Sequence, residues 1–436
     1  MSILFTNVTA VTMSPDQPVL SGVFVAVEGI KIASVGPEHP AGEFERVIDC
    51  TGKVMMPGLV NAHTHVPMAL MRGYGGGCDL HTWLNDYIFP AEAKLDDRCV
   101  AAGAALGLAE MIASGTTCIA DMYMNTGTIA KTVLEAGISA NLACGAVYFG
   151  DPADFSPEKC GDCKNHVRLY EDWHNAGEGQ LRVDASIHAE YTSCPPVWEW
   201  VAGFAREHGL RMHVHVSETA SEHEKCLEKY GVTPAQILDR YGVWQNGGIA
   251  AHCVYLSGGD AELFAERGVT AVHNPVSNLK LMSGVAPLFF LRDCGMQTAL
   301  GTDGVASNNS HDMFEEMKTA ALVQNYSFGE DHGQLSAADI LAMATVNGAR
   351  ALGRDTGVIA AGKIADMILL DFTAPNLFPC HDIMENLVYS ANGSNVCMNM
   401  ARGKIIYENG TFLTLDLEKI RAEVAGYALP RIFGGK

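Results

Sequence analysis

Basic residues are scarce in this sequence of 436 residues, and their scarcity excludes one class of partner. Lysine and arginine together number 29, against 50 aspartates and glutamates, which gives a formal net charge of −21. A field of that sign repels phosphate backbones, and no basic run in the chain offsets it. We therefore expect no nucleic acid partner.

Long apolar runs and ordered cysteine pairs are also missing. The longest apolar stretch falls well short of a membrane span, and the first residues show neither a basic leader nor a small-residue cleavage site. The 13 cysteines follow no repeating spacing, and the pair Cys160 and Cys163 has no second pair at zinc-ribbon distance. These features predict a cytoplasmic protein with reduced thiols and no membrane association.

The two ends of the chain share one sequence pattern. Short apolar runs punctuated by glycine cover residues 3–11, 23–27 and 31–35, and similar runs return at 366–371, 396–400 and 403–407. This alternation is typical of short antiparallel strands with tight turns. We expect residues 1–57 and 356–436 to form one small β-sandwich domain that also carries a C-terminal helix.

The middle of the chain, residues 58–355, alternates apolar runs with helical stretches such as 97–114 and 195–208. The apolar runs cover residues 58–65, 116–123, 139–147, 182–190, 210–217, 248–255, 269–274 and 296–303. Eight strands that alternate with helices predict an α/β protein of the (β/α)8 TIM barrel type, and their low content of charge fits buried parallel strands. The run at 139–147 is the weakest of the eight.

Ionisable side chains lie at or near the ends of six of these runs, where a barrel places its catalytic groups. One buried histidine is usually a satisfied core residue, but so many at one end of a barrel indicate a site for a divalent transition metal. The residues concerned are His63, His65, His188, His213, His215, Glu218, His252, His273 and Asp303.

Spacing refines this metal hypothesis. His63 and His65 form an H-x-H pair, so both side chains point to the same face of one strand. His215 would be a third ligand from across the barrel, and Asp303 a fourth that can also accept a proton from bound water. His213 has the same parity as His215 but lies about 6–7 Å deeper, in the core or behind the ligands.

Glu218 follows His215 by three residues and has two interpretations. It is either an acidic residue at the start of a helix or a proton shuttle beside the metal. Water addition to an aromatic C–N centre requires protonation of a ring nitrogen and later of the leaving ammonia. A carboxylic acid with a raised pKa can do both.

Residues 68–83 are rich in glycine and apolar side chains and are expected to form a mobile lid-like segment. In that role Trp83 would close over an aromatic base. Packing of Trp83 in the core is an almost equal alternative.

The segments PGLVNAHTH, HVHVSE, AAHCVYL, HNPVSNLKLMSGVAP and LGTDGVASNN carry a family resemblance. Through them nearly the whole chain resembles the amidohydrolase superfamily, and within it the branch of 5′-methylthioadenosine/S-adenosylhomocysteine deaminases and chlorohydrolase-like proteins. The resemblance implies a distorted barrel. It also implies one divalent metal, usually zinc and sometimes iron, held by His63, His65, His215 and Asp303.

The resemblance also implies roles for residues around the metal. Glu218 would be the acid/base that contacts the ring, and His252 would hydrogen-bond the attacking hydroxide or the adduct. Glu92 matches a carboxylate that holds the ribose hydroxyls, and His188 matches a histidine that contacts the substrate. Binuclear relatives carry a bridging lysine on the fourth strand, which residues 182–188 lack, so a single metal is expected.

One departure from the family pattern concerns the substrate. Close relatives have an arginine near the end of the third strand, where this chain has Cys144. The loop at 150–165 also lacks arginine. Either the 5′ substituent of the substrate differs from that of the relatives' substrates, or Lys159 or Lys164 takes the place of that arginine.

These residues lead to a functional hypothesis. The chain is expected to deaminate a 5′-modified adenosine (S-adenosylhomocysteine, 5′-methylthioadenosine, 5′-deoxyadenosine or adenosine) to the inosine analogue. The alternatives are a deaminase or dechlorinase of guanine, a pterin or a triazine on the same scaffold and, more remotely, a non-catalytic binding protein. Glu218 with His252 favours deamination, and Glu92 favours a nucleoside. The prevalence of closed symmetry favours a homo-oligomer.

Overall fold

The two ends of the chain meet in one nine-stranded sheet. In the computed structural model, which describes residues 2–434, its strand order is β18-β17-β16-β15-β5-β1-β2-β3, with β4 beside β1. The N-terminal strands are β1 (Ser2–Val11), β2 (Val19–Glu28), β3 (Lys31–Gly36), β4 (Arg46–Asp49) and β5 (Lys53–Pro57). The C-terminal strands are β15 (Met367–Asp371), β16 (Val396–Ala401), β17 (Lys404–Glu408) and β18 (Thr411–Phe412).

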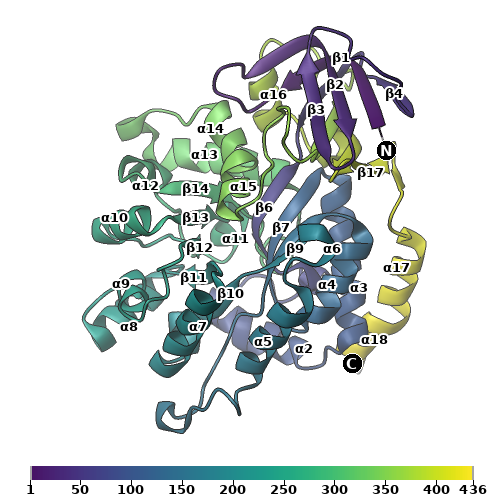
Figure 1. The fold of residues 1–436 in the computed structure, drawn as a ribbon. Helices are drawn as coiled ribbons and strands as arrows, with labels where there is room; N and C mark the ends of the chain where they lie inside the picture. The colour runs from purple at the N-terminus through teal and green to yellow at the C-terminus, as the bar shows by residue number, and fades with distance from the viewer. Residues whose placement is uncertain (1, 435–436) are drawn as a thin grey trace.

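Strand β5 joins the two halves of this sheet. It pairs with β15 in antiparallel register and with β1 in parallel register, and β4 also runs parallel to β1. The remaining neighbours in the sheet are antiparallel, as the alternating pattern predicts. Figure 1 shows this sheet at the top of the molecule, above the barrel. The domain boundaries at residues 57 and 356 stay a prediction.

The middle of the chain forms the expected barrel, and the α/β fold class is confirmed. Its parallel strands form two sheets, with the orders β6-β7-β8-β9 and β10-β11-β12-β13-β14. The first sheet contains β6 (Leu59–Thr64), β7 (Thr116–Met122), β8 (Ser139–Ala143) and β9 (Leu181–Val183). The second contains β10 (Ala185–Ala189), β11 (Met212–Val216), β12 (Gly248–His252), β13 (Val269–His273) and β14 (Gln297–Leu300). The barrel is distorted because its wall is divided.

The division of the wall occurs within the fourth expected strand, which is two strands rather than one. Asp184 separates them: its N–H donates to Leu142 O on β8, whereas the N–H of Ala185 donates to Arg211 O beside β11. The chain therefore changes partners within two residues. Two isolated bridges, Thr64 to Asp303 and Ala146 to Ile187, connect the two sheets.

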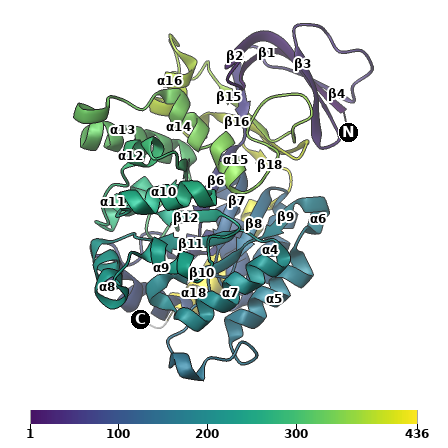
Figure 2. The ribbon, with the colours of Figure 1, turned by 60° about the vertical axis from the view of Figure 1, so that its left-hand side comes forward.

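Helices surround the strands, and Figure 2 shows them outside β10, β11 and β12. Those between β6 and β11 are α1 (Leu80–Thr82), α2 (Phe89–Glu92), α3 (Asp97–Ala113), α4 (Thr126–Ala136), α5 (Gly161–Trp173), α6 (Ala176–Gly179) and α7 (Pro195–His208). Those between β11 and β14 are α8 (Ala220–Tyr230), α9 (Pro234–Arg240), α10 (Gly258–Arg267), α11 (Pro275–Lys280) and α12 (Leu288–Asp293). Beyond β14 are α13 (Met313–His332), α14 (Ala337–Met343), α15 (Val346–Ala351) and α16 (Ile383–Tyr389).

Short helical turns lie between these elements. The 3-10 turns are η1 (Val66–Met71), η3 (Pro152–Asp154), η4 (Glu190–Thr192) and η5 (Gly393–Asn395), and η2 (Trp83–Ile88) is a π-helix. The sequence explains many boundaries. For example, α7 has Pro195 at its first position and ends at Gly209, whose φ is +64°.

The C-terminal helical segment lies along the barrel (Figure 1). It consists of α17 (Leu417–Glu423), the π-helix η6 (Val424–Ala428) and α18 (Leu429–Phe433), and it packs on α3. The Tyr427 hydroxyl donates to Asp96 Oδ2 at 2.6 Å, and Arg431 Nε lies 3.1 Å from the same atom. This contact places the end of the chain against the barrel.

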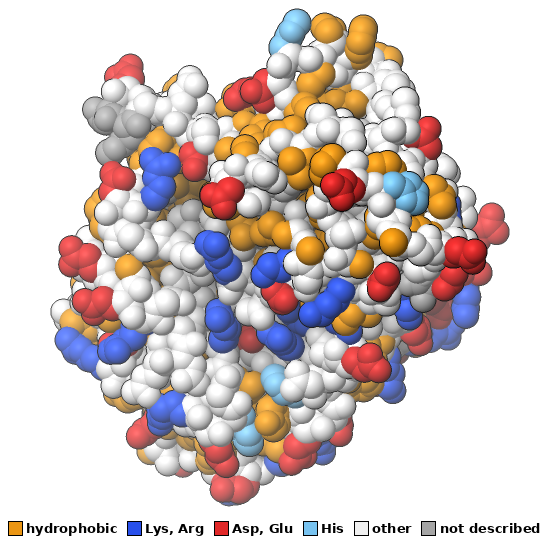
Figure 3. Space-filling view, turned by 45° about the horizontal axis from the view of Figure 1, so that its top comes forward, with side chains coloured by type: hydrophobic (Ala, Val, Ile, Leu, Met, Phe, Trp, Pro, Cys, Tyr) orange, Lys and Arg blue, Asp and Glu red, His pale blue; other side chains and the backbone are white. Residues whose placement is uncertain are grey.

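The surface reflects the acidic composition only in part. On the face drawn in Figure 3, acidic side chains lie mostly around the edge, and Lys and Arg side chains gather across the middle. Within residues 2–434, none of the helices has the length and apolar character needed to cross a bilayer.

Closure of the barrel depends on a close approach at Gly301. A Cβ added there would lie 2.7 Å from His63 O, 2.8 Å from His63 N and 2.6 Å from Asn274 Oδ1. We expect Gly301→Ala to destabilise the protein by about 1–3 kcal/mol, because the backbone of β6 must move. Denaturant unfolding measures this. Gly259→Ala in α10 is the matched control, since its Cβ would meet only Gln236 Nε2 at 3.6 Å; equal stabilities for the two variants would contradict the prediction.

Candidate active site

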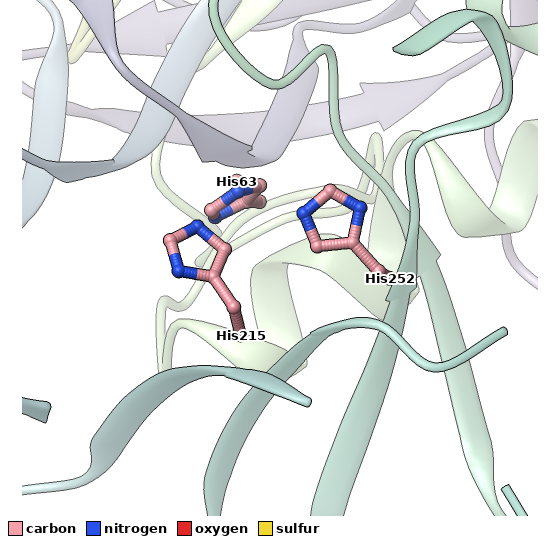
Figure 4. Close-up of side chains that lie close together, drawn as sticks. All are labelled: His63, His215 and His252. Carbon is pink, nitrogen blue, oxygen red and sulfur yellow. The ribbon is translucent and has the colours of Figure 1, made fainter. Parts of the chain in front are cut away.

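Five ionisable side chains from four strand ends converge inside the barrel. His63 belongs to β6, and His65 follows that strand directly. His215 lies on β11, His252 ends β12, and Asp303 follows β14 by three residues. Figure 4 shows the rings of His63, His215 and His252 close together. Because parallel strands all end at the same rim, residues that are distant in sequence become neighbours here.

The distances within this cluster are those of a metal site. Asp303 Oδ1 lies 3.2 Å from His65 Nε2 and 3.6 Å from His63 Nε2, and the Nε2 atoms of His65 and His215 are 3.3 Å apart. Ligand atoms of His63, His65 and Asp303 all lie within 4.8 Å of one another, as do those of His63, His215 and His252. Among the described residues, the buried His63 Nε2 has no hydrogen-bond partner.

Burial and mutual contacts set the protonation of the cluster. Burial lowers the pKa of His63 to about 3 and holds the pKa of His215 well below its usual range. Burial also opposes the charge of His65, but the contact with Asp303 outweighs it and raises the pKa of His65 to about 9. Burial alone would raise the pKa of Asp303, yet the facing imidazoles hold it well below its usual range. His63 and His215 are thus neutral and Asp303 is ionised, which are the forms that bind a divalent cation. A cation bound there would displace the proton that Asp303 holds on His65.

The Nδ1 atoms of His63, His65 and His215 form hydrogen bonds with groups outside the cluster. His65 Nδ1 bonds Met122 O at 2.5 Å, and His215 Nδ1 bonds His188 O at 2.7 Å. A hydrogen bond of 2.8 Å joins His63 Nδ1 to His213 Nε2. These contacts turn each Nε2 toward the cluster, as the outer partners of metal-binding histidines do. His213 thus lies behind the candidate ligands, whereas the buried His273 does not line the cavity.

Asp303 has two further partners that sequence reasoning missed. Ser277 Oγ donates to Asp303 Oδ2 at 2.6 Å, and Ser307 Oγ donates to the same atom at 2.9 Å. Oδ1 is thereby left to face the histidines. The only signal in the sequence was the polar PVSN segment after β13, because Ser307 lies in a loop without regular spacing.

Glu218 and His252 form a second buried pair beside the cluster. His252 Nε2 lies 3.7 Å from Glu218 Oε2, and Ser283 Oγ donates to Glu218 Oε1 at 3.3 Å. Glu218 precedes α8, whose N-cap is Thr219, so it is not part of the helix. Burial raises the pKa of Glu218, which favours a carboxyl that carries a proton.

Glu222, which the sequence did not single out, positions Glu218. Its Oε1 accepts the N–H of Ser217 at 2.8 Å, and its Oε2 accepts the N–H of Glu218 at 2.7 Å. Burial raises the pKa of Glu222 to about 8. The signal for this role was an acidic residue in the first turn of the following helix. A capping residue of this kind fixes the backbone that carries the acid.

One cavity of about 500 Å³ contains the cluster, and the remaining candidate residues line it. Glu92 ends α2, and burial raises its pKa. Burial lowers the pKa of His188, on β10, to about 4. Trp83 is 5% exposed, and its Nε1 donates to Tyr74 O at 3.3 Å, so it packs in the core and lines the cavity at the same time. The mobility expected for residues 68–83 stays a prediction.

Comparison with known proteins places this fold and site in a family. A profile of the amidohydrolase family matches residues 54–406. The chain belongs to the amidohydrolase family. It is 41% identical over 422 residues to a 5′-deoxyadenosine deaminase from Methanosarcina acetivorans, which covers 97% of this chain and 96% of the relative. It is 42% identical over 426 residues to a 5-methylthioadenosine/S-adenosylhomocysteine deaminase from Caldanaerobacter subterraneus, with 97% of each chain covered.

Solved structures agree with this assignment. An adenosine deaminase from Xanthomonas campestris with bound zinc superimposes on the amidohydrolase with a TM-score of 0.92 and 33% identity, over 99% of this chain and 98% of the other. An atrazine chlorohydrolase from Arthrobacter aurescens, 24% identical, has the same fold with a TM-score of 0.89 over 97% and 99% of the two chains. The donor set of this amidohydrolase fits a divalent metal.

The side chain of Asn278 fixes the orientation of His252 in this amidohydrolase. Asn278 Oδ1 lies 2.8 Å from His252 Nδ1, so it accepts the proton of that nitrogen and leaves Nε2 facing Glu218. If His252 contacts the reacting oxygen, we expect Asn278→Ala to lower kcat about 10- to 100-fold, as loss of an outer partner does for a metal-binding histidine, with little change in KM. Asn278→Asp keeps the acceptor and should restore most of kcat. Steady-state kinetics measure both, and equal losses in the two variants would contradict a positioning role.

Proposed function

We propose that this amidohydrolase removes the 6-amino group of a 5′-modified adenosine and releases the inosine analogue and ammonia. The observation that carries the proposal is the position of Glu218 and His252, a buried acid and imidazole, beside a cluster of metal ligands in one cavity. The two deaminase relatives at 41% and 42% identity over 97% of the chain support the same reaction.

One divalent metal would be held by His63, His65, His215 and Asp303. Three imidazoles and one carboxylate suit zinc first and ferrous iron second, and the zinc bound to the Xanthomonas relative supports that order. A cation at this position lowers the pKa of water toward ~7 and so supplies a nucleophile at neutral pH.

The residues around the metal divide the proton transfers between them. Asp303, held at Oδ2 by two serine hydroxyls, accepts the proton that the attacking water releases. Glu218 carries a proton because burial raises its pKa, and it protonates N1 of the purine. His252 hydrogen-bonds the oxygen that adds to C6. The amino group then leaves as ammonia with a proton from Glu218 or Asp303.

The remaining candidates hold the rest of the nucleoside. Glu92 accepts hydrogen bonds from the ribose 2′ and 3′ hydroxyls, since a carboxylate has acceptors for both. His188 contacts the substrate beside the cluster, and Trp83 packs against the base. Together these contacts favour a nucleoside over a free base.

Ammonia release by the metal-loaded protein tests the proposal. The panel contains S-adenosylhomocysteine, 5′-methylthioadenosine, 5′-deoxyadenosine, adenosine, adenine, guanine, a pterin and a chlorotriazine. We expect ammonia only from the adenosines. Activity on guanine, the pterin or the triazine alone would overturn the assignment of Glu92 and His188. Failure to take up stoichiometric metal, together with no ammonia from any compound, would favour the alternative of a non-catalytic binding protein.

A further inference from the structure

Glu316 is a buried acidic residue to which the proposed reaction gives no role. It lies in the first turn of α13 and is 1% exposed, and it does not line the active cavity. Its hydrogen-bond partners are uncharged N–H donors rather than a cation. Burial of a carboxyl group is costly unless its oxygens are well satisfied, so the position of Glu316 needs an explanation.

The two oxygens of Glu316 contact two separate segments at the rim of the barrel. Oε1 accepts a hydrogen bond from the side-chain amide of Asn308, which lies in the loop after β14. Oε2 accepts the N–H of Val276 at 3.4 Å, in the first turn of α11. One carboxyl group on α13 therefore connects the loop after β14 to the start of α11.

Each serine that holds Asp303 is next to one of these two contacts. Ser277 follows Val276 in the chain, and Ser307 precedes Asn308. The two serine hydroxyls donate to Oδ2 of the aspartate at 2.6 and 2.9 Å. The carboxyl group on α13 thus binds both segments that provide partners for this oxygen, one residue away from each serine.

The backbone around Asp303 depends on the same contacts. Asp303 has a φ of +58°, in the left-handed region that residues other than glycine adopt at a cost, so its neighbours must hold it there. The Nδ2 atom of Asn308 donates to Thr302 O at 2.7 Å as well as to the carboxyl group of Glu316. The amide of Asn308 therefore links Glu316 to the backbone that carries the aspartate.

A second contact joins the same two segments. Lys280 Nζ, at the end of α11, donates to Ala306 O at 3.0 Å and to the side-chain oxygen of Asn309. Lys280 is half-buried, and its contact with Asn309 is exposed to solvent. Because water competes for an exposed contact, we expect the buried carboxyl group of Glu316 to contribute more to holding the segments together.

We infer that Glu316 is a positioning residue: it holds the two serines against Oδ2 of Asp303, so that Oδ1 faces the imidazoles. This inference rests on the proposed function, in which Asp303 is both a metal ligand and a base. Groups behind a metal ligand orient it, and their removal lowers metal affinity or activity. Glu316 would act in this way through the serines, without contact with metal or substrate.

The test measures zinc affinity by competition with a chelator, and kcat and KM for ammonia release from 5′-methylthioadenosine with zinc in excess. Glu316→Leu removes both acceptors and should lower zinc affinity and kcat about 10- to 100-fold each. KM should change little, because Glu316 lies outside the cavity lining. Glu316→Gln keeps one acceptor and should give a smaller loss of both quantities. Glu315→Gln changes the exposed neighbour on α13 and should match the parent protein.

A second comparison separates positioning from a general loss of stability. The double variant Ser277→Ala/Ser307→Ala lacks the hydroxyls through which Glu316 would act. In that background, Glu316→Leu should lower zinc affinity further by less than about threefold. A residue that only stabilises the barrel would cause the same loss with or without the serines, so equal losses in the two backgrounds would overturn the inference.

The outcomes also separate this inference from the proposed function. No ammonia from any adenosine would overturn the proposed function, whereas unchanged zinc affinity in Glu316→Leu would overturn the inference. A parent protein that binds no zinc would overturn both. If Glu316→Leu does not fold, Glu316→Gln decides by the same measurements. Zinc affinity and kcat equal to those of the parent would then overturn the inference, and a loss of both at an unchanged KM would support it.

Discussion

Replacement of Glu218 by glutamine is expected to lower kcat for adenosine deamination about 1,000-fold while the metal content stays unchanged. Glutamine keeps the shape of the side chain, and its amide can still meet His252 and Ser283, but it cannot transfer a proton to the ring. The carboxyl contacts no candidate metal ligand closely, since its nearest imidazole is His252 at 3.7 Å. Steady-state ammonia release and elemental analysis of the same preparation measure both quantities.

The control for this variant lies on the helix that follows. Glu224 is exposed on α8 and does not line the cavity, so Glu224→Gln should retain the parent kcat. Activity retained in Glu218→Gln with metal present would refute the role of Glu218 as the acid. Loss of metal from Glu218→Gln would instead make Glu218 part of the metal site.

Replacement of Asp303 by alanine is expected to have the larger effect, because Asp303 is both a proposed ligand and a proposed base. We expect substoichiometric metal after purification and a fall in kcat/KM of at least about 1,000-fold. The Nε2 atoms of His63 and His65 would lose the oxygen that faces them at 3.6 and 3.2 Å. Elemental analysis and turnover with added zinc measure the change.

Two further variants make the result for Asp303 specific. Asp355→Ala removes an exposed carboxylate paired with Lys363 outside the cavity lining and should leave metal and activity unchanged. Ser307→Ala removes one of the two hydroxyls at Oδ2 and should give an intermediate loss, because Ser277 still holds that oxygen. Full metal content and full activity in Asp303→Ala would exclude Asp303 from the site.

Much of the scaffold could be predicted from sequence because it depends on local patterns. The eight apolar runs cover nearly all of the barrel strands, and five of the ionisable residues at their ends lie close together at one rim: His63, His65, His215, His252 and Asp303. The break at Asp184 could not be predicted, because the N–H of Asp184 donates to β8 whereas the N–H of Ala185 donates to Arg211 O beside β11. Nor does the sequence place the C-terminal helices on α3, since that contact depends on tertiary packing.

Individual hydrogen bonds in the site could not be predicted from the sequence either. Spacing predicts which face of a strand carries His63 and His65, because side chains alternate along a strand. It does not predict that Glu222 caps the backbone of Ser217 and Glu218, or that Ser277 and Ser307 share one oxygen of Asp303. Those hydrogen bonds join loops to helices α8 and α11, whose relative positions follow from the assembled barrel.

The bridge between Thr64 and Asp303 has a consequence for the order of events during synthesis. These two residues are 239 positions apart, yet they bring the earliest and the latest proposed ligands together. A nascent chain therefore lacks a complete donor set until the eighth strand run has been made and the ring has closed. Bringing such distant segments together costs chain entropy that local contacts cannot offset early. The proposed metal site is therefore among the last parts of the barrel to be completed.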